Sequence, residues 1–495
     1  MTVPVGKSVA KVSAQGAEVP ALGRAERPLT SAAGWMLCAA MVFAPFALGS
    51  VPPPAITILV CWLLLTMLLW ALDCTRERRL PRFAPTLWIS GGALLALGWL
   101  MAWNAHAAYQ PLYGAPVPIR SPFPSLPGSE EQVVSLLAMT RLTALFAALL
   151  VVADLGRDPR WRGRFLYTLA FTGAGVALFG LVQQAGWVTF VARRMNRYEG
   201  AYFATFNYHA NAGAYLNLAL APICVLCVVS LLGGESKQRL VAFSLLGLVV
   251  TATLANTSRG AQAITLGLLL VLGSWGCIRM LSRAQEQIRD RRVVFSAALA
   301  AAVLALGGVF VLYGRNAEKW RQLPEHLTEN SSRWQVWRIA LPMGWEGGAF
   351  GHGPGTFKML LPVSPRLSTA LYSRWIIQKH TPGTQVSMWS MAHEDYLQTW
   401  VEYGWVGALL YGIIFFGGIL RGIRRLPKAS QSPGRVQDRS WVGIVAALAG
   451  VAVHAAFDFP LQVMSLQLTV AVLLGLCWSA DATIRDVPED AGRVT

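Results

Sequence analysis

Hydrophobic residues occur along this chain in long runs, and short polar stretches separate one run from the next. Each run is about 20 residues long, the length that a helix needs to cross a hydrocarbon core of about 30 Å. The pattern predicts an all-α fold, a polytopic helical membrane protein with about 12 transmembrane helices. The expected spans are Ser31–Ser50, Pro54–Leu72, Ala84–Trp103, Val133–Val152, Arg164–Ala185, Asn211–Leu232, Leu240–Asn256, Gly260–Ile278, Val293–Tyr313, Tyr396–Leu420, Trp441–Phe459 and Leu461–Ala480.

One polar insert, residues 314–395, is far longer than the other connections. It divides the chain into spans over residues 31–313 and spans over residues 396–480. We expect the insert to form a loop domain outside the membrane. Residues 1–30 are polar and predict a disordered cytoplasmic tail, and residues 481–495 a second one.

The composition supports a membrane protein, because 54% of the residues are hydrophobic and only 14% are charged. Soluble domains carry about 25% charged residues. The net charge of +17 would indicate a nucleic-acid partner in a soluble chain. Here Lys and Arg gather in alternate connections, such as 76–82, 157–164 and 289–292, as the positive-inside rule requires. We therefore expect membrane lipids and no nucleic acid as partners, with the long insert facing outward.

Two further outer segments are polar. Residues 104–132 contain six prolines and predict an extended covering loop. The second segment carries Arg193, Arg194 and Arg197 among aromatic residues. Three cations on a short outer loop are contrary to the positive-inside rule. Their presence favours binding of an anionic part of the substrate, and pairing with lipid headgroups or within the structure is the alternative.

Arg259 lies in LANTSRGA, at a tight turn between two expected spans. Asn256, Thr257 and Ser258 can cap the helix that follows, and Gly260 permits close approach. The guanidinium group is either an interfacial anchor or, beside free helix amides, part of an oxyanion-binding corner.

The insert contains SSRWQVWRIAL, which predicts an interfacial helix carrying Arg333 and Arg338. Its expected apolar face is Trp334, Trp337 and Leu341, lying flat against the membrane. GHGPGTF follows, and we expect a sharp turn rather than a phosphate loop, because it has neither the lysine nor the following helix of one.

His393 is the sharpest single candidate, in AHEDYLQ at the start of a span. A histidine just inside a helix N-terminus is suited to act as a general base, with structural hydrogen bonding as the alternative. No further ligands stand at zinc spacing, so we expect no metal and no cofactor. Asp395 beside it is a candidate substrate contact.

Three buried ionisable residues need partners inside the membrane. His454 and Asp458 stand four residues apart in VHAAFDFPLQ, so a mutual hydrogen bond is expected, serving either to lock the helix or to support the site. Arg141 lies in the fourth span without an evident partner. Cys224 and Cys227 form a C-x-x-C pattern within an apolar run, where packing is the expected role.

Several of these segments resemble the shared motifs of the O-antigen ligase and O-antigen polymerase superfamily. They are FNYHANAGAYL, SRGA, SSRWQVWRIAL with GHGPGTF, AHEDYLQTWVEYGWVG and HAAFDFPLQ, in this order over the second half of the chain. The resemblance implies a multi-pass protein of the bacterial inner membrane with a periplasmic loop region between late spans. Many relatives have Asn where this chain has Glu394.

The resemblance also implies a function, namely metal-independent glycosyl transfer at the periplasmic face. The donor would be a glycan on undecaprenyl diphosphate, and the acceptor a sugar of lipid A–core or of another lipid-linked glycan. Arg259 and Arg333 match the arginines that handle the diphosphate, and His393 matches the histidine that activates the acceptor. The residues themselves are compatible with this chemistry, because guanidinium groups can neutralise a leaving diphosphate.

Other functions stay open. About twelve spans would suit a transporter of polysaccharide or lipid-linked sugar, although the chain shows no clear repeat and its polar candidates lie at the outer face. A structural scaffold in a glycan assembly complex is the third possibility. Within the superfamily, the VHAAFDFPLQ segment slightly favours an exopolysaccharide-type polymerase over a ligase.

Overall fold

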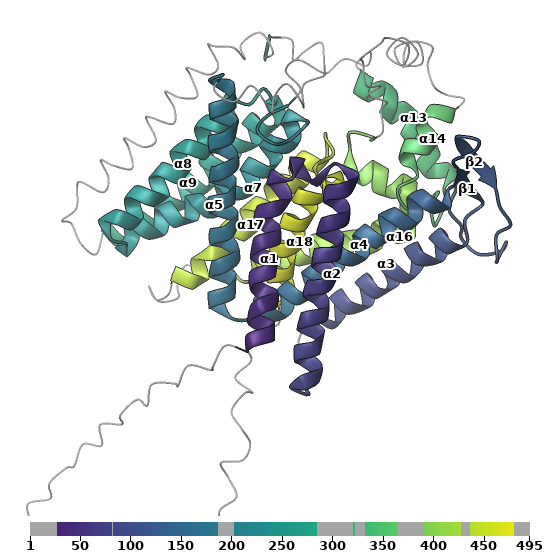
Figure 1. The fold of residues 1–495 in the computed structure, drawn as a ribbon. Coiled ribbons are helices and arrows are strands. Elements are labelled where there is room, and N and C mark those ends of the chain that lie inside the picture. The colour runs from purple at the N-terminus through teal and green to yellow at the C-terminus, as the bar shows by residue number, and fades with distance from the viewer. Residues whose placement is uncertain are drawn as a thin grey trace, which may run out of the picture.

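The computed structural model describes residues 27–81, 83–186, 202–284, 320–321, 332–364, 391–426 and 436–479. Within these ranges nine helices are long and apolar enough to cross a membrane. They are α1 (Pro28–Phe46), α2 (Pro53–Arg76), α3 (Pro85–Trp103), α4 (Gln132–Leu155), α5 (Pro159–Gln184), α7 (His209–Gly233), α8 (Ser236–Ala255), α9 (Arg259–Ala284) and α16 (Asp395–Arg424) (Figure 1).

The described residues also include two shorter apolar helices, α17 (Val436–Ala455) and α18 (Met464–Trp478). Every expected span coincides with one of these eleven helices except Val293–Tyr313, which lies outside the described residues. Residues 1–26 and 480–495, which hold nearly all of the two expected tails, also lie outside them. The chain is therefore a mostly helical, polytopic membrane protein, as the hydrophobic runs predicted.

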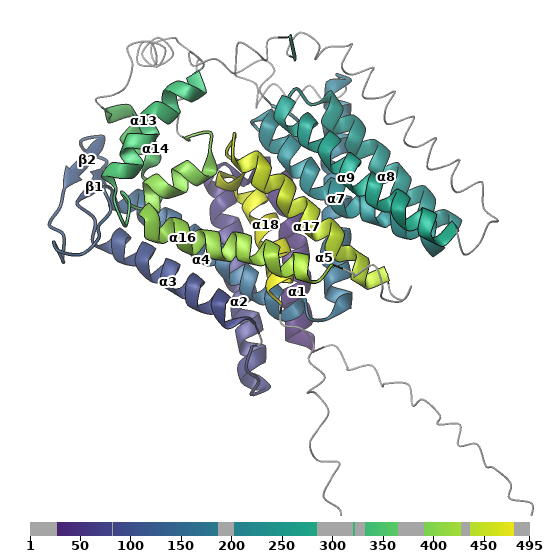
Figure 2. The ribbon, with the colours of Figure 1, turned by 180° about the vertical axis from the view of Figure 1, so that it is seen from behind.

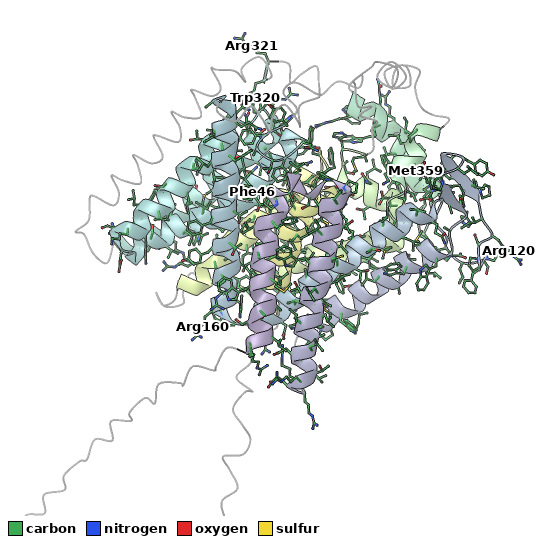
Figure 3. The ribbon with its side chains drawn as sticks, viewed as in Figure 1. Phe46, Arg120, Arg160, Trp320, Arg321 and Met359 are labelled. Atoms are coloured by element: carbon green, nitrogen blue, oxygen red, sulfur yellow. The ribbon has the colours of Figure 1, made fainter. Side chains whose placement is uncertain are left out.

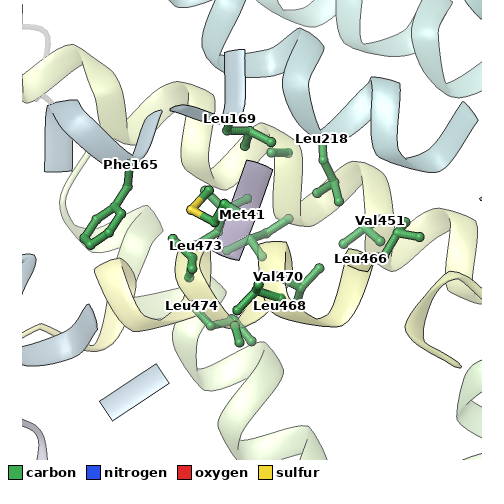
Figure 4. Close-up of a cluster of buried hydrophobic side chains, with 14 of the residues drawn as sticks. Met41, Phe165, Leu169, Leu218, Val451, Leu466, Leu468, Val470, Leu473 and Leu474 are labelled. Atoms are coloured by element: carbon green, nitrogen blue, oxygen red, sulfur yellow. The ribbon is translucent and has the colours of Figure 1, made fainter. Parts of the chain in front are cut away.

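The last helix, α18, lies at the centre of the molecule (Figure 1). All of its residues except Gln467 are buried, which is the pattern of a helix that is apolar on every side. Figure 4 shows Leu466 and Val470 of α18 among side chains from α1, α5, α7 and α17. Seen from behind, α16 and α17 pass in front of α18 (Figure 2).

The two ends of the helical bundle differ in charge. Arg76, Arg160 and Arg424 are exposed at the end where α2 and α16 finish and α5 begins, which we call the basic end. The opposite end, here called the site end, carries the start of α7 and the turn between α8 and α9. Figure 3 shows Arg160 near the first and Trp320 near the second.

The proline-rich segment at the site end contains a hairpin, where the sequence predicted only an extended loop. Strands β1 (Ala107–Gln110) and β2 (Ala115–Pro118) pair antiparallel. A two-stranded sheet has only edge strands, so prolines are tolerated there. The Glu131 carboxylate fastens the hairpin, because it accepts the amide of Tyr109 at 2.7 Å and also caps the first turn of α4.

Two short helices of the long insert are described, α13 (Ser332–Glu346) and α14 (Phe357–Val363). Trp334 and Leu341, on the apolar face expected for α13, are exposed, and Trp337 is half-buried, so the contact of this face with the membrane stays a prediction. The buried face consists of Val336, Ile339, Ala340 and Met343. These side chains pack against the first turns of α16, so the helix is held by protein on the face opposite its exposed tryptophan.

The GHGPGTF segment between α13 and α14 is a sharp turn packed against α16. Gly351, Gly353 and Gly355 all have positive φ, at 77°, 111° and 73°, which only glycine adopts at little cost. The turn fits where α16 is broken at Gly404, also at positive φ. The amides of His352 and Gly353 donate to backbone carbonyls of α16 at 3.0 and 2.9 Å. These amides are therefore occupied by protein, which agrees with the prediction that the segment is no phosphate loop.

His352 links this turn to the segment before α4. Its Nδ1 lies 3.5 Å from Glu130 Oε1, and its Nε2 lies 3.0 Å from the carbonyl oxygen of Met343. The hydrogen bond with Glu130 raises the pKa of His352 above its usual value, although burial acts in the opposite direction. A raised pKa stabilises the fold at pH values below about 6.5, and this stabilisation is lost as the pH rises through the raised value.

We predict that His352→Gln lowers the thermal unfolding midpoint of the purified protein more at about pH 5.5 than at about pH 9, because only the protonated ring makes the full ion pair. The measurement is a thermal unfolding series across pH in detergent. Arg120→Gln, at an exposed residue of the same end without an imidazole, is the control and should follow the wild-type pH dependence. Equal destabilisation by His352→Gln at both pH values would contradict this account.

Candidate functional site

A buried carboxylate, Asp458, joins the polar groups of the site end. Its Oδ1 lies 3.3 Å from His393 Nδ1, and its Oδ2 lies 3.4 Å from Arg333 Nη2. The hydroxyl of Tyr208 also donates to Oδ2 at 3.4 Å. These contacts bring together the segment before α7, helix α13, the segment before α16 and the segment after α17. A buried charge requires such partners.

His393 lies immediately before the helix, not inside it as the sequence suggested. Glu394 is the N-cap of α16, and its carboxylate accepts the amides of Tyr396 and Leu397. His393 itself has a φ of 54°, an uncommon conformation outside glycine. Its ring meets Phe459 edge-on at 4.6 Å between centroids, and its side chain remains 17% exposed. The imidazole is thus held in place and still accessible from outside.

Arg333 reaches the same cluster from α13. Besides Asp458, its guanidinium group donates to the carbonyl oxygen of Phe457 at 3.0 Å and to the Tyr208 hydroxyl at 3.4 Å. The side chain is 40% exposed. Part of the guanidinium group therefore faces outward, where it can meet a ligand.

Arg259 is the first residue of α9 and approaches Arg333. The turn before it is fixed by Asn256 Oδ1, which accepts the amide of Ser258 at 3.0 Å. Gly260 lies so close to Phe457 that a Cβ would come within 2.5 Å of the ring. The charges of Arg259 and Arg333 are near enough to repel one another. The two guanidinium groups therefore lie within electrostatic range of each other, and their joint action on one ligand stays a prediction.

The electrostatics of the cluster favour an ionised Asp458 and a neutral Tyr208. Burial alone would raise the pKa of Asp458, but the hydrogen bond from His393 and the charge of Arg333 hold it below its usual value. Burial and the nearby Asp458 raise the pKa of the Tyr208 phenol. Tyr208 is therefore a hydrogen-bond donor to a carboxylate that carries its charge at neutral pH.

A short 3₁₀ turn, η2 (Pro460–Gln462), follows Asp458 and is fastened by the buried Asp395 and the half-buried Arg141. Asp395 accepts the amide of Leu461 at 2.8 Å and the side-chain amide of Gln462 at 3.0 Å. Arg141 of α4 donates to Gln467 at 2.6 Å and to the carbonyl oxygen of Gln462. Arg141, for which the sequence showed no partner, is thus paired with this turn and the helix that follows it. Asp395 is buried with both oxygens occupied, which favours a positioning role over the substrate contact that the sequence suggested.

The hydrogen bond expected between His454 and Asp458 is replaced by other contacts. Helix α17 ends at Ala455, and the backbone amide of Asp458, rather than its carboxylate, bonds to His454, donating to its carbonyl oxygen at 3.0 Å. The Asp458 carboxylate points to His393 and Arg333, and the His454 ring stacks on Phe457 at 5.3 Å between centroids. His454 therefore supports the backbone that Arg333 contacts.

The remaining candidates are Arg338 and a group of three arginines. Arg338 is exposed on α13, beyond Arg333. Arg193, Arg194 and Arg197 lie outside the described residues.

Tyr208 was not singled out from the sequence, although it lies in the FNYHANAGAYL segment. Its ring stacks on Phe459 at 5.3 Å, nearly parallel, and meets His393 edge-on at 6.1 Å. An aromatic residue directly before an apolar span normally indicates an interfacial anchor. Only the fold brings Phe459 and Asp458 to it, so the sequence signal is weak.

Residues 222–412 match the family model described as O-antigen ligase. The matched range contains Arg259, Arg333 and His393, whereas Tyr208 and Asp458 lie outside it. A comparison with curated proteins found no match.

Proposed function

We propose that this chain, which belongs to the O-antigen ligase and polymerase superfamily through residues 222–412, transfers a glycan from undecaprenyl diphosphate to a sugar hydroxyl. Members of this family act on lipid-linked glycans. The observation that carries the proposal is the convergence of His393, Arg333 and Asp458, with Arg259 beside them. We place the reaction at the periplasmic face of the inner membrane, because the basic end would then face the cytoplasm.

In this proposal His393 is the general base. The contact of its Nδ1 with Asp458 at 3.3 Å supports a tautomer in which Nδ1 donates and Nε2 accepts, the arrangement that an adjacent carboxylate favours in hydrolytic triads. Nε2 takes the proton of the acceptor hydroxyl while the hydroxyl oxygen attacks the anomeric carbon. Asp458 stabilises the imidazolium that forms.

Arg259 and Arg333 receive the leaving group. As the bond between the anomeric carbon and the diphosphate oxygen breaks, the polyprenyl diphosphate gains negative charge. Two guanidinium groups that repel each other are both stabilised by such an anion, and bidentate pairing with phosphate is strong in a partly dry site. The reaction as proposed needs no metal ion, because the arginines neutralise the diphosphate.

The acceptor decides between two forms of this function. A ligase uses lipid A–core, and a polymerase uses a second lipid-linked glycan. The two differ in what deletion of the protein does to cells. Full-length chains without attachment to lipopolysaccharide indicate ligation, and loss of chain length indicates polymerisation.

We predict that His393→Ala lowers kcat by about 10²–10⁴-fold, because general-base help of this kind has that size. The assay follows transfer from a purified lipid-linked donor by the purified protein in the presence of a chelator. His106→Ala is the control and should keep wild-type activity. Near-wild-type transfer by folded His393→Ala would exclude His393 as the base.

We predict that Arg259→Lys and Arg333→Lys each lower kcat/KM by about 10²-fold, because lysine keeps the charge but loses bidentate pairing with the diphosphate. Arg120→Lys, at an exposed arginine of the same end (Figure 3), is the matched control and should change kcat/KM by less than about twofold. The opposite outcome, lysine variants as active as the control, would show that the arginines do not clamp the diphosphate.

A further inference from the structure

A cavity lies at the basic end, away from the site described above. Its volume is about 640 Å³, and it opens between α5, α7, α8 and the start of α17. This volume lies within the range of about 300–1,000 Å³ that is typical of small-molecule sites. Neither the proposed reaction nor the family resemblance uses it.

The walls of this cavity are apolar. Tyr167 and Phe171 stand one turn apart on α5, and both side chains are more than half exposed. Leu226 and Val229 of α7 form the facing wall, and Val241 of α8 adds to it. Large apolar side chains that remain exposed in a membrane protein mark surfaces that lipid chains can cover.

The mouth of the cavity is cationic. Lys237 lies in the first turn of α8, and Arg439 lies near the start of α17. Both helices begin at the basic end, where the exposed Arg76, Arg160 and Arg424 also lie. Headgroups of the bilayer lie at this level, so a bound molecule would meet these cations at the membrane surface.

The cavity therefore combines a charged mouth with a deep apolar wall. From Gly234 at the mouth to Leu226, the wall runs along eight residues of the chain, almost all of them helical, which corresponds to about 12 Å. A soluble phosphate would use only the mouth, and a neutral lipid only the wall. A molecule with a phosphate headgroup and acyl chains uses both.

We propose that this cavity binds an anionic glycerophospholipid, with its phosphate between Lys237 and Arg439 and an acyl chain along α7 and α8. Basic pockets between transmembrane helices on the cytoplasmic side bind such headgroups in other membrane proteins. The bound lipid joins α8 and α17, whose other ends lead to Arg259 and to Asp458. It lies at the opposite end of the bundle from those residues, so this binding is separate from donor binding.

The test measures which lipid the purified full-length protein retains, by native mass spectrometry after exposure to an equal mixture of dioleoyl phosphatidylglycerol and dioleoyl phosphatidylethanolamine. The wild-type protein should retain phosphatidylglycerol preferentially. Lys237→Gln/Arg439→Gln should lower this retention by about ten- to thirtyfold, because each basic residue near a headgroup contributes a few-fold or more.

Two further variants separate this site from general surface charge. Arg76→Gln/Arg424→Gln removes the same charge from the same end outside the cavity, and it should keep wild-type retention. Val229→Trp fills the cavity without changing any charge, and it should lose the bound lipid as the double variant does. Equal losses in the two charge variants, retention by Val229→Trp, or equal retention of both lipids by the wild type would each overturn the proposal.

Discussion

The arrangement of the site end depends on the contacts that the buried Asp458 carboxylate makes. A charge buried this deeply is stable only when cations and hydrogen-bond donors surround it. Arg333, His393 and Tyr208 supply them, each from a different segment of the chain. The four segments are far apart in the sequence. Their meeting at one carboxylate therefore fixes the positions of the starts of α7, α13 and α16 and of the end of α17 relative to one another.

The helices and turns around Asp458 follow from this constraint. The turn after α17 must stay rigid to hold the carboxylate, and Asp395 and Arg141 fasten it from α16 and α4. Helix α13 must pack on α16 for Arg333 to reach Asp458, and its buried face of Val336, Ile339, Ala340 and Met343 holds it there. The same arrangement leaves His393 and Arg333 partly exposed, which is what a site for a membrane-anchored substrate requires.

Much of the fold could be predicted because apolar run length alone specifies a spanning helix. The hairpin was missed because its prolines are typical of loops, and only the pairing of two edge strands makes them compatible with a sheet. The second apolar side of α13, which packs on α16, was missed because the sequence does not show which helix the insert contacts.

The residues proposed for the site could be named from the sequence, but the pairing of His393 with Asp458 could not. Arg259, Arg333 and His393 could be predicted because they match motif positions of the family. The two arginines suit the diphosphate, and the histidine suits a general base. The partner of His393 could not be found, because the i, i+4 rule assigns Asp458 to His454 on a continuous helix. Beyond the end of α17 the Asp458 carboxylate points to His393 and Arg333, and this direction is not readable from residue spacing.

The central claim is that Asp458 acts through His393, and a double-mutant cycle on the transfer reaction tests it most directly. The rate is measured for His393→Ala, for Asp458→Asn and for the two changes combined. Residues that act as one unit are strongly non-additive. The account predicts that Asp458→Asn costs less than about threefold once His393 is alanine, although it is severe in the wild-type chain. Losses that multiply in the combined variant would contradict it.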